Sequence, residues 1–277
     1  MRAVLRIALV ALLTVAAAAS AQDAEPVTLR LHPRVGDTLR TLLEQQTEVS
    51  ATMPGNSGAP TRVVTTSVAI YSRTIVRSVR QASTTVLTIV DSAMLTSTDA
   101  RGATMMADAQ RSLQGQQLVL QLGVDGTVES ARDAHGVLVP RHVADAMSAM
   151  PAVFPKKPVT VGDQWMRDMP LPSGGPMGAR GSGHVRATFH LDSLRKGGAI
   201  GYVSMRGDIV GDSTSQGGEL SGSISGTMQL DRARGWMTDS RFLVILRSVV
   251  KPPLATGLAP MRFVTRVTQR LRTMDKR

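Results

Sequence analysis

The chain of 277 residues contains no cysteine. This absence excludes a disulfide framework, thiol catalysis and metal sites with cysteine ligands. It also excludes a lipid anchor attached to an acylated N-terminal cysteine. A chain of this length can bury a sizeable core, so we expect the fold to be held by packing alone.

Aromatic residues are scarce, with two Trp, two Tyr and four Phe, while the formal net charge is +11. Proteins that bind single-stranded nucleic acid place aromatic platforms between their basic residues. Here the arginines are spread along the whole chain, so the sequence does not favour a nucleic-acid partner. A solvated basic surface explains the charge, and attraction to an anionic membrane or envelope polymer is the alternative.

Long apolar runs are also missing, except at the N-terminus. Arg2 and Arg6 precede an uncharged apolar run that closes on Ala19-Ser20-Ala21. This pattern predicts a signal peptide over residues 1–21, cleaved near Ala21-Gln22. The run is shorter than the roughly 20 residues of a spanning helix. We therefore expect an exported protein, periplasmic or extracellular, that is soluble after cleavage.

Alternating apolar and polar residues fill much of the mature chain and predict antiparallel strands with one wet face. From Leu220 to Leu230 the even positions are Leu, Gly, Ile, Gly, Met and Leu, and the odd positions are polar. Glycine on the inward side indicates close backbone approach or strong curvature. Asp125-Gly126 predicts a tight hairpin. Further strands are expected near 62–80, 84–97, 118–124, 127–131, 183–194, 199–211, 236–250 and 261–271.

Two segments have helical spacing of apolar residues, one at about Pro140–Met150 and a weaker one at Thr104–Leu113. Both are rich in methionine, whose flexible side chain suits either a core or an adaptable apolar lining. The core is the simpler interpretation. The alternative is that the methionines line an apolar cleft: Met105, Met106, Met147 and Met150.

The motif Val-Gly-Asp occurs twice, at Val35-Gly36-Asp37 and at Val161-Gly162-Asp163, each time ahead of a strand-rich stretch. The repetition indicates two related β units. The expected organisation is a first β-rich unit over 22–139, a connecting helix over 140–152 and a second β-rich unit over 153–277, and one continuous domain is the alternative. The fold class is mainly β (α+β), a large curved antiparallel sheet with one or two covering helices.

No catalytic, cofactor or metal motif survives inspection. Gly211-Asp212-Ser213 resembles an esterase nucleophile block, but no histidine follows it, so a turn is the better interpretation. Ser193-Leu194-Arg195-Lys196 lacks the partner elements of serine acyl-transferases. The five histidines do not occur at spacings that pair two ligands. We predict no catalytic residue, cofactor or metal, although an enzyme with a dispersed site stays open.

The signal peptide, the hairpin Leu120–Gly126, the central helix and the segment Pro158–Trp165 together resemble a group of uncharacterised secreted bacterial proteins. In architecture the pattern is similar to the periplasmic lipoprotein-carrier folds, which are curved antiparallel sheets closed by helices over an apolar cleft. This resemblance implies binding of a lipid or another apolar ligand. No site residue is transferred from it.

Two functions follow as hypotheses. The first is a non-catalytic envelope protein that binds an apolar or lipid-like ligand in a curved-sheet cleft. The second is a scaffold or interaction protein that presents an arginine-rich strand face to an anionic envelope component or a protein partner. The candidate contacts for that face are Arg262, Arg266, Arg270 and Arg272.

Overall fold

The computed structural model describes residues 25–52, 62–139, 154–170, 183–211, 219–250 and 260–274. They form eleven strands and one helix. In chain order these are β1 (Thr38–Thr52), β2 (Arg62–Val79), β3 (Ser83–Ser97), α1 (Ala100–Leu113), β4 (Gln117–Gly123), β5 (Val128–Asp133), β6 (Gln164–Pro170), β7 (Gly183–Arg195), β8 (Ile200–Gly211), β9 (Leu220–Asp231), β10 (Trp236–Val250) and β11 (Met261–Met274).

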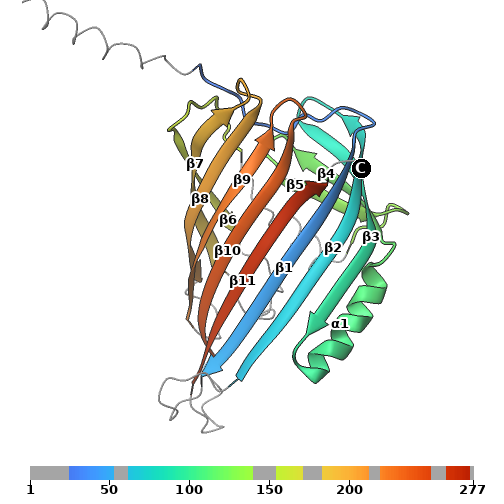
Figure 1. The fold of residues 1–277 in the computed structure, drawn as a ribbon, viewed down its shortest axis with the longest axis vertical. Coiled ribbons are helices and arrows are strands. Elements are labelled where there is room, and N and C mark those ends of the chain that lie inside the picture. The colour runs from blue at the N-terminus through green and yellow to red at the C-terminus, as the bar shows by residue number, and fades with distance from the viewer. Residues whose placement is uncertain are drawn as a thin grey trace, which may run out of the picture.

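All eleven strands belong to one antiparallel sheet, in the order β5-β4-β3-β2-β1-β11-β10-β9-β8-β7-β6. Neighbours in the sheet are neighbours in the chain, except that β1 pairs with β11, the last strand. The sheet curls so strongly that β4, β5 and β6 lie behind β1, β10 and β11 in Figure 1. The predicted fold class, a mainly β protein with a large curved antiparallel sheet, is confirmed.

Strand parity divides the sheet into an inner and an outer face. Val185, Ala187, Phe189 and Leu191 of β7 are buried and point inward, with Met205 of β8 and Met228 of β9 beside them in register. These residues and others from both halves of the chain form a single hydrophobic core. The inner face is therefore the concave face of the sheet.

Inward glycines allow the bend at β8, β9 and β10. A Cβ added to Gly222 would lie 2.2 Å from the carbonyl oxygen of Ile245 on the next strand, and one added to Gly207 would lie 2.6 Å from that of Arg186. No side chain fits at such distances. The glycines predicted to mark curvature do so because the neighbouring backbone closes over them.

One end of the sheet carries the short turns at 80–82, 124–127, 196–199 and 232–235, and we call it the turn end. The segment Val27–Pro33, here called the N-terminal strap, crosses it. Val27 pairs with Val159, Leu31 N donates to Val124 O (2.9 Å), and His32 N donates to Gly235 O (3.2 Å). Val27, Leu29 and Leu31 are buried against the core, so the strap closes the inner face at this end (Figure 1).

The two Val-Gly-Asp turns have the same geometry. Gly36 and Gly162 both have positive φ, at 88° and 98°. Each glycine N–H donates to a carbonyl of the following strand in the sheet, at Val76 and Leu191, and each of these residues donates back to the aspartate carbonyl. The turns thus fasten β1 to β2 and β6 to β7 in one manner. That the two halves are related units stays a prediction.

Helix α1 lies along the edge of β3, beyond the last residue that β4 pairs (Figure 1). Gln110 of the helix accepts a hydrogen bond from Leu95 N (3.0 Å), so the helix supplies a partner to an otherwise open strand edge. The helix predicted over Thr104–Leu113 is confirmed, although it begins earlier. The one predicted over Pro140–Met150 lies outside the described residues, as does the signal peptide.

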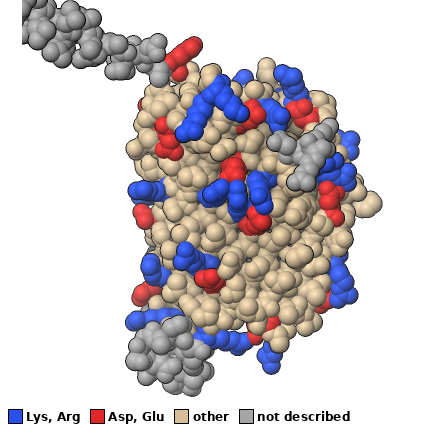
Figure 2. All heavy atoms as spheres, in the orientation of Figure 1, with Lys and Arg blue, Asp and Glu red and all other residues tan. Residues whose placement is uncertain are grey.

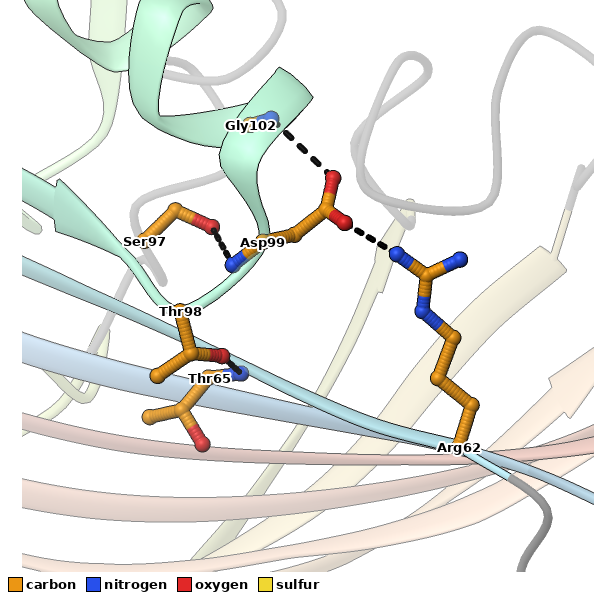
Figure 3. Close-up of polar contacts among 6 residues, drawn as sticks. All are labelled: Arg62, Thr65, Ser97, Thr98, Asp99 and Gly102. Carbon is orange, nitrogen blue, oxygen red and sulfur yellow. Dashed lines mark hydrogen bonds and ion pairs between the residues drawn. The ribbon is translucent and has the colours of Figure 1, made fainter.

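Polar contacts set the start of α1 (Figure 3). Asp99 is the N-cap and accepts from Gly102 N (3.1 Å), which satisfies a helix-end donor. The other carboxylate oxygen of Asp99 pairs with Arg62 of β2, and Thr65 N donates to Thr98 Oγ1 (2.9 Å).

Among the described residues no helix is long and apolar enough to span a membrane.

Candidate functional site on the inner face of the sheet

The inner face is uncharged over most of the sheet. On β1, β2, β3 and β7–β11, the register places one charged residue inward, Arg62 at the start of β2, which lies opposite Ala51 and pairs with Asp99. The other inward positions hold aliphatic, aromatic, hydroxyl and amide side chains and glycine. A face of this kind favours an apolar surface next to it over water.

Burial of the apolar side chains along the inner face decreases away from the turn end. Leu29, Val76, Val86, Leu191 and Leu230 are at most 2% exposed and fill the turn end. Farther from it, the inward apolar side chains of β1, β2, β9, β10 and β11 are only half-buried, although the polar Ser248 and Thr265 are buried. The half-buried apolar side chains include Val68, Ile70, Ile224, Phe242, Val244, Leu246 and Val267. This half-buried apolar stretch, here called the lower lining, is the candidate ligand-binding surface.

Two amide side chains interrupt the lower lining. Gln45 of β1 and Gln269 of β11 are directly opposite each other in the register, between Val68 of β2 and Phe242 of β10. Both are half-buried. Gln45 Nε2 donates to Thr47 Oγ1 (3.3 Å), whereas the side chain of Gln269 makes no hydrogen bond to the described part of the chain.

Two pairs of hydroxyl groups join adjacent strands on the inner face. Thr41 Oγ1 and Ser72 Oγ are 2.8 Å apart, and Thr74 Oγ1 and Thr88 Oγ1 are 3.2 Å apart, each pair joining adjacent strands. The buried Oγ1 of Thr265 on β11, in contrast, finds no partner among the described residues. Thr265 lies two positions from Val267 on the same face as Gln269.

A charged side chain does point inward on the edge strand β6. Arg167 lies opposite the inward residue Ala187, and its side chain is 15% exposed. Its Nη2 donates to the carbonyl of Phe154 and lies 3.8 Å from the carboxylate of Asp125, in the turn between β4 and β5. Arg167 thus links the two edges of the sheet near the turn end.

The arginines of β11 all lie on the outer face. Arg272 pairs with Glu44 at 3.3 Å and Arg270 with Asp239 at 3.4 Å. Arg262 and Arg266 are exposed and form no ion pair with described residues. Figure 2, which views this face, shows basic and acidic side chains interspersed rather than one field of positive charge.

The methionines proposed as a cleft lining do not all fall within the described residues. Met105 is 68% exposed on α1 and Met106 is half-buried, in a helix with no buried side chain. Met147 and Met150 lie outside the described residues. The apolar lining that the structure describes is built from strand residues.

The polar clusters give little that resembles catalytic machinery. His190 Nδ1 lies 2.6 Å from Asp192 Oδ1, which also accepts from Ser204 Oγ (2.8 Å). Because the carboxylate lies between them, the imidazole is not placed to take the serine proton. Hydrogen bonds from the backbone and side chain of Thr160 lower the pKa of Asp163, but this aspartate is a turn residue. No group of three potential metal ligands occurs in the described ranges.

One of the two serine motifs of the sequence, Ser193–Lys196, lies within the described residues. Lys196 and Gly197 both have positive φ, at 54° and 62°, and form the turn between β7 and β8. Ser193 on β7 therefore precedes a turn and not a helix, as expected. Asp212 and Ser213 lie outside the described residues.

Comparison with known proteins adds a family match over part of the chain. Residues 140–237 match the model of a family of unknown function, DUF6263. This agrees with the resemblance to proteins of uncharacterised activity and brings no catalytic or binding residue with it. No curated protein matches the chain.

Three solved structures are similar over most of their length but at low scores. DynF, from the dynemicin biosynthesis pathway of Micromonospora chersina, is 9% identical over 91% of this chain and 88% of its own, with a TM-score of 0.24. An outer membrane channel from Pseudomonas putida F1 is 10% identical over 88% and 97%, with a TM-score of 0.23. The CymD monoaromatic hydrocarbon channel is 7% identical over 88% and 90%, with a TM-score of 0.27.

Two features of the inner face were not predicted from the sequence. In the strap, Val27, Leu29, Leu31 and Pro33 alternate with exposed residues, a period-2 pattern too short to stand out. Every second residue of the last strand faces inward, and Gln269, between Val267 and Leu271, is the one amide among these residues. Its interruption of that pattern was the available signal.

Proposed function

We propose that this protein is exported and binds an apolar, lipid-like ligand, without catalysis, on the lower lining of its curved sheet. The observation that carries the proposal is the inner face of β1, β2 and β9–β11, where Arg62 is the one charged residue and is paired with Asp99, and where the apolar side chains beyond the turn end stay half-buried. A solid core would bury them fully, as the turn end does. Export is supported by the N-terminal sequence over residues 1–21.

Covering these side chains with a ligand removes apolar surface from water, at about 25 cal/mol per Å². Polar groups in such sites are few and placed to orient the ligand. In the lower lining, two amide side chains, Gln45 and Gln269, lie among the apolar ones. The strap and the core fill the turn end, so the ligand would lie against the part of the lining that the strap does not reach.

An uncharged fluorescent probe, N-phenyl-1-naphthylamine, tests the proposal on the mature chain. We expect saturable binding with a blue shift. Val267→Glu places a charge on the lower lining and should weaken binding by about tenfold or more, because an unpaired charge is costly in an apolar site. Thr268→Glu is the matched control, since Thr268 is the next residue and is exposed on the outer face.

Equal affinities for the two variants, with both folded by circular dichroism, would place the probe elsewhere and contradict the proposal. Native mass spectrometry after gentle purification gives an independent result. A retained apolar molecule supports the proposal. A clean apo mass together with no probe binding overturns it.

A second candidate function rests on the outer face of β10 and β11. Arg247 lies opposite Val264, and Arg262 and Arg266 are the outward residues on either side of that valine. Glu48 faces Arg266 in the register, but its carboxylate accepts from Gln46 (3.1 Å). We propose that this trio, which has no ion pair with described residues, contacts an anionic membrane or envelope polymer.

Vesicles containing phosphatidylglycerol test this second function. We expect binding that weakens as salt rises, because exposed charges are screened within about 10 Å at 0.1 M salt. The double variant Arg262→Gln/Arg266→Gln should lose more binding than Arg270→Gln/Arg272→Gln, whose arginines are already paired. An equal loss in both, or binding insensitive to salt, would exclude the trio as the contact.

A further inference from the structure

The side chains of Gln45 and Gln269, here called the amide pair, indicate which class of ligand the lower lining would bind. Gln45 and Gln269 face each other across β1 and β11, and residues directly opposite in an antiparallel pair have Cβ atoms about 5 Å apart. Around them lie Val68 and Phe242 in the same cross-strand row, and Leu43, Leu271, Val267 and Thr47 in the adjacent rows. The two amides are thus a polar point with apolar side chains on most sides.

An amide that is half-removed from water without a partner costs free energy. The side chain of Gln269 has no hydrogen bond to described residues, and Gln45 uses only one donor, toward Thr47. Each glutamine amide offers two donors and two acceptor lone pairs. The pair therefore keeps both kinds of hydrogen-bonding capacity available on the inner face.

The same surface has no unpaired countercharge for an ionised ligand. Apart from Arg62, which pairs with Asp99, the inward positions of β1, β2, β3 and β7–β11 are uncharged. The inward cation Arg167 of β6 is engaged with Phe154 and Asp125 near the turn end. A carboxylate or phosphate on the lower lining would lose its hydration without gaining a cation.

We infer that the ligand is a neutral amphiphile, such as a fatty amide, alcohol or ester. Its uncharged polar group binds Gln45 and Gln269, and its chain lies along β9 and β10 against Ile224, Val244 and Leu246. This inference rests on the proposed function and adds the class of ligand to it.

Displacement of N-phenyl-1-naphthylamine by three ligands of one chain length tests the inference: dodecanamide, dodecanol and dodecanoate at pH 8. We expect the two neutral ligands to displace the probe at concentrations about tenfold or more below that of dodecanoate. The double variant Gln45→Leu/Gln269→Leu should lower the affinity for dodecanamide by about tenfold, as for one or two net hydrogen bonds, whereas the affinity for the apolar probe should not fall.

Gln46→Leu is the matched control, because Gln46 neighbours Gln45 and is exposed on the outer face. It should leave all affinities unchanged. If the double variant does not fold, Gln269→Leu alone decides, with the same expected loss for dodecanamide. Equal displacement by all three ligands, or unaltered dodecanamide affinity in a folded variant, overturns the neutral-amphiphile inference while probe binding still supports the proposed function. Absence of probe binding in the native chain overturns both.

Discussion

At Gly226 a Cβ would lie 2.4 Å from the carbonyl oxygen of Arg241 and 2.4 Å from Cδ1 of Phe242. The ring of Phe242 therefore covers the glycine on the inner face. Phe242 also lies directly opposite Gln269, at one side of the amide pair. One residue without a side chain thus permits both the bend of the sheet and the position of an aromatic ring in the lower lining.

We predict that Gly226→Ala destabilises the protein by about 1–3 kcal/mol, the usual cost of overpacking a filled site. The loss of unfolded-state entropy that normally favours alanine over glycine is smaller than this. Chemical denaturation followed by circular dichroism measures the change. Ser225→Ala, at the next and exposed position, should stay within about 0.5 kcal/mol. A Gly226→Ala variant as stable as this control would show that the backbone is not crowded there.

At the scale of elements, the strap and α1 perform related tasks. Each supplies contacts where the sheet leaves groups uncovered: the strap across the turn end, and α1 along the β3 edge beyond β4. Neither is a strand of the sheet. Gly235 shows how closely the strap is seated, because a Cβ there would lie 2.5 Å from the backbone nitrogen of His32.

Leu29→Ala tests the strap. Leu29 is 1% exposed, and its Cδ2 lies 3.6 Å from the place where a Cβ on Gly201 of β8 would be. Removing this side chain should lower the free energy of unfolding by about 2–5 kcal/mol, as for other buried leucines. Arg30→Ala, exposed on the same segment, should change it by about 0.5 kcal/mol or less. Similar values for the two variants in urea denaturation would mean that the strap does not close the core.

At the scale of the whole molecule, the odd number of strands sets the relative direction of the two edge strands. Each neighbour in the order is antiparallel, so with eleven strands the two edge strands, β5 and β6, run in the same direction. A short hairpin cannot join parallel strands, and the chain between Asp133 and Gln164 has to return from one end of the sheet to the other. Phe154, Arg167 and Asp125 link the two edges where this return reaches the turn end.

The sequence by itself determined the strands, their turns and their inner and outer faces, because period-2 alternation and turn glycines are local properties. The inward glycines of β9 and the Val-Gly-Asp turns could be read in this way. The tertiary structure alone decided that β1 pairs with β11, because strand pairing between distant segments leaves no local pattern. That pairing brings Gln45 and Gln269 together. The candidate site therefore depends on contacts between the two ends of the chain, which no short stretch of sequence encodes.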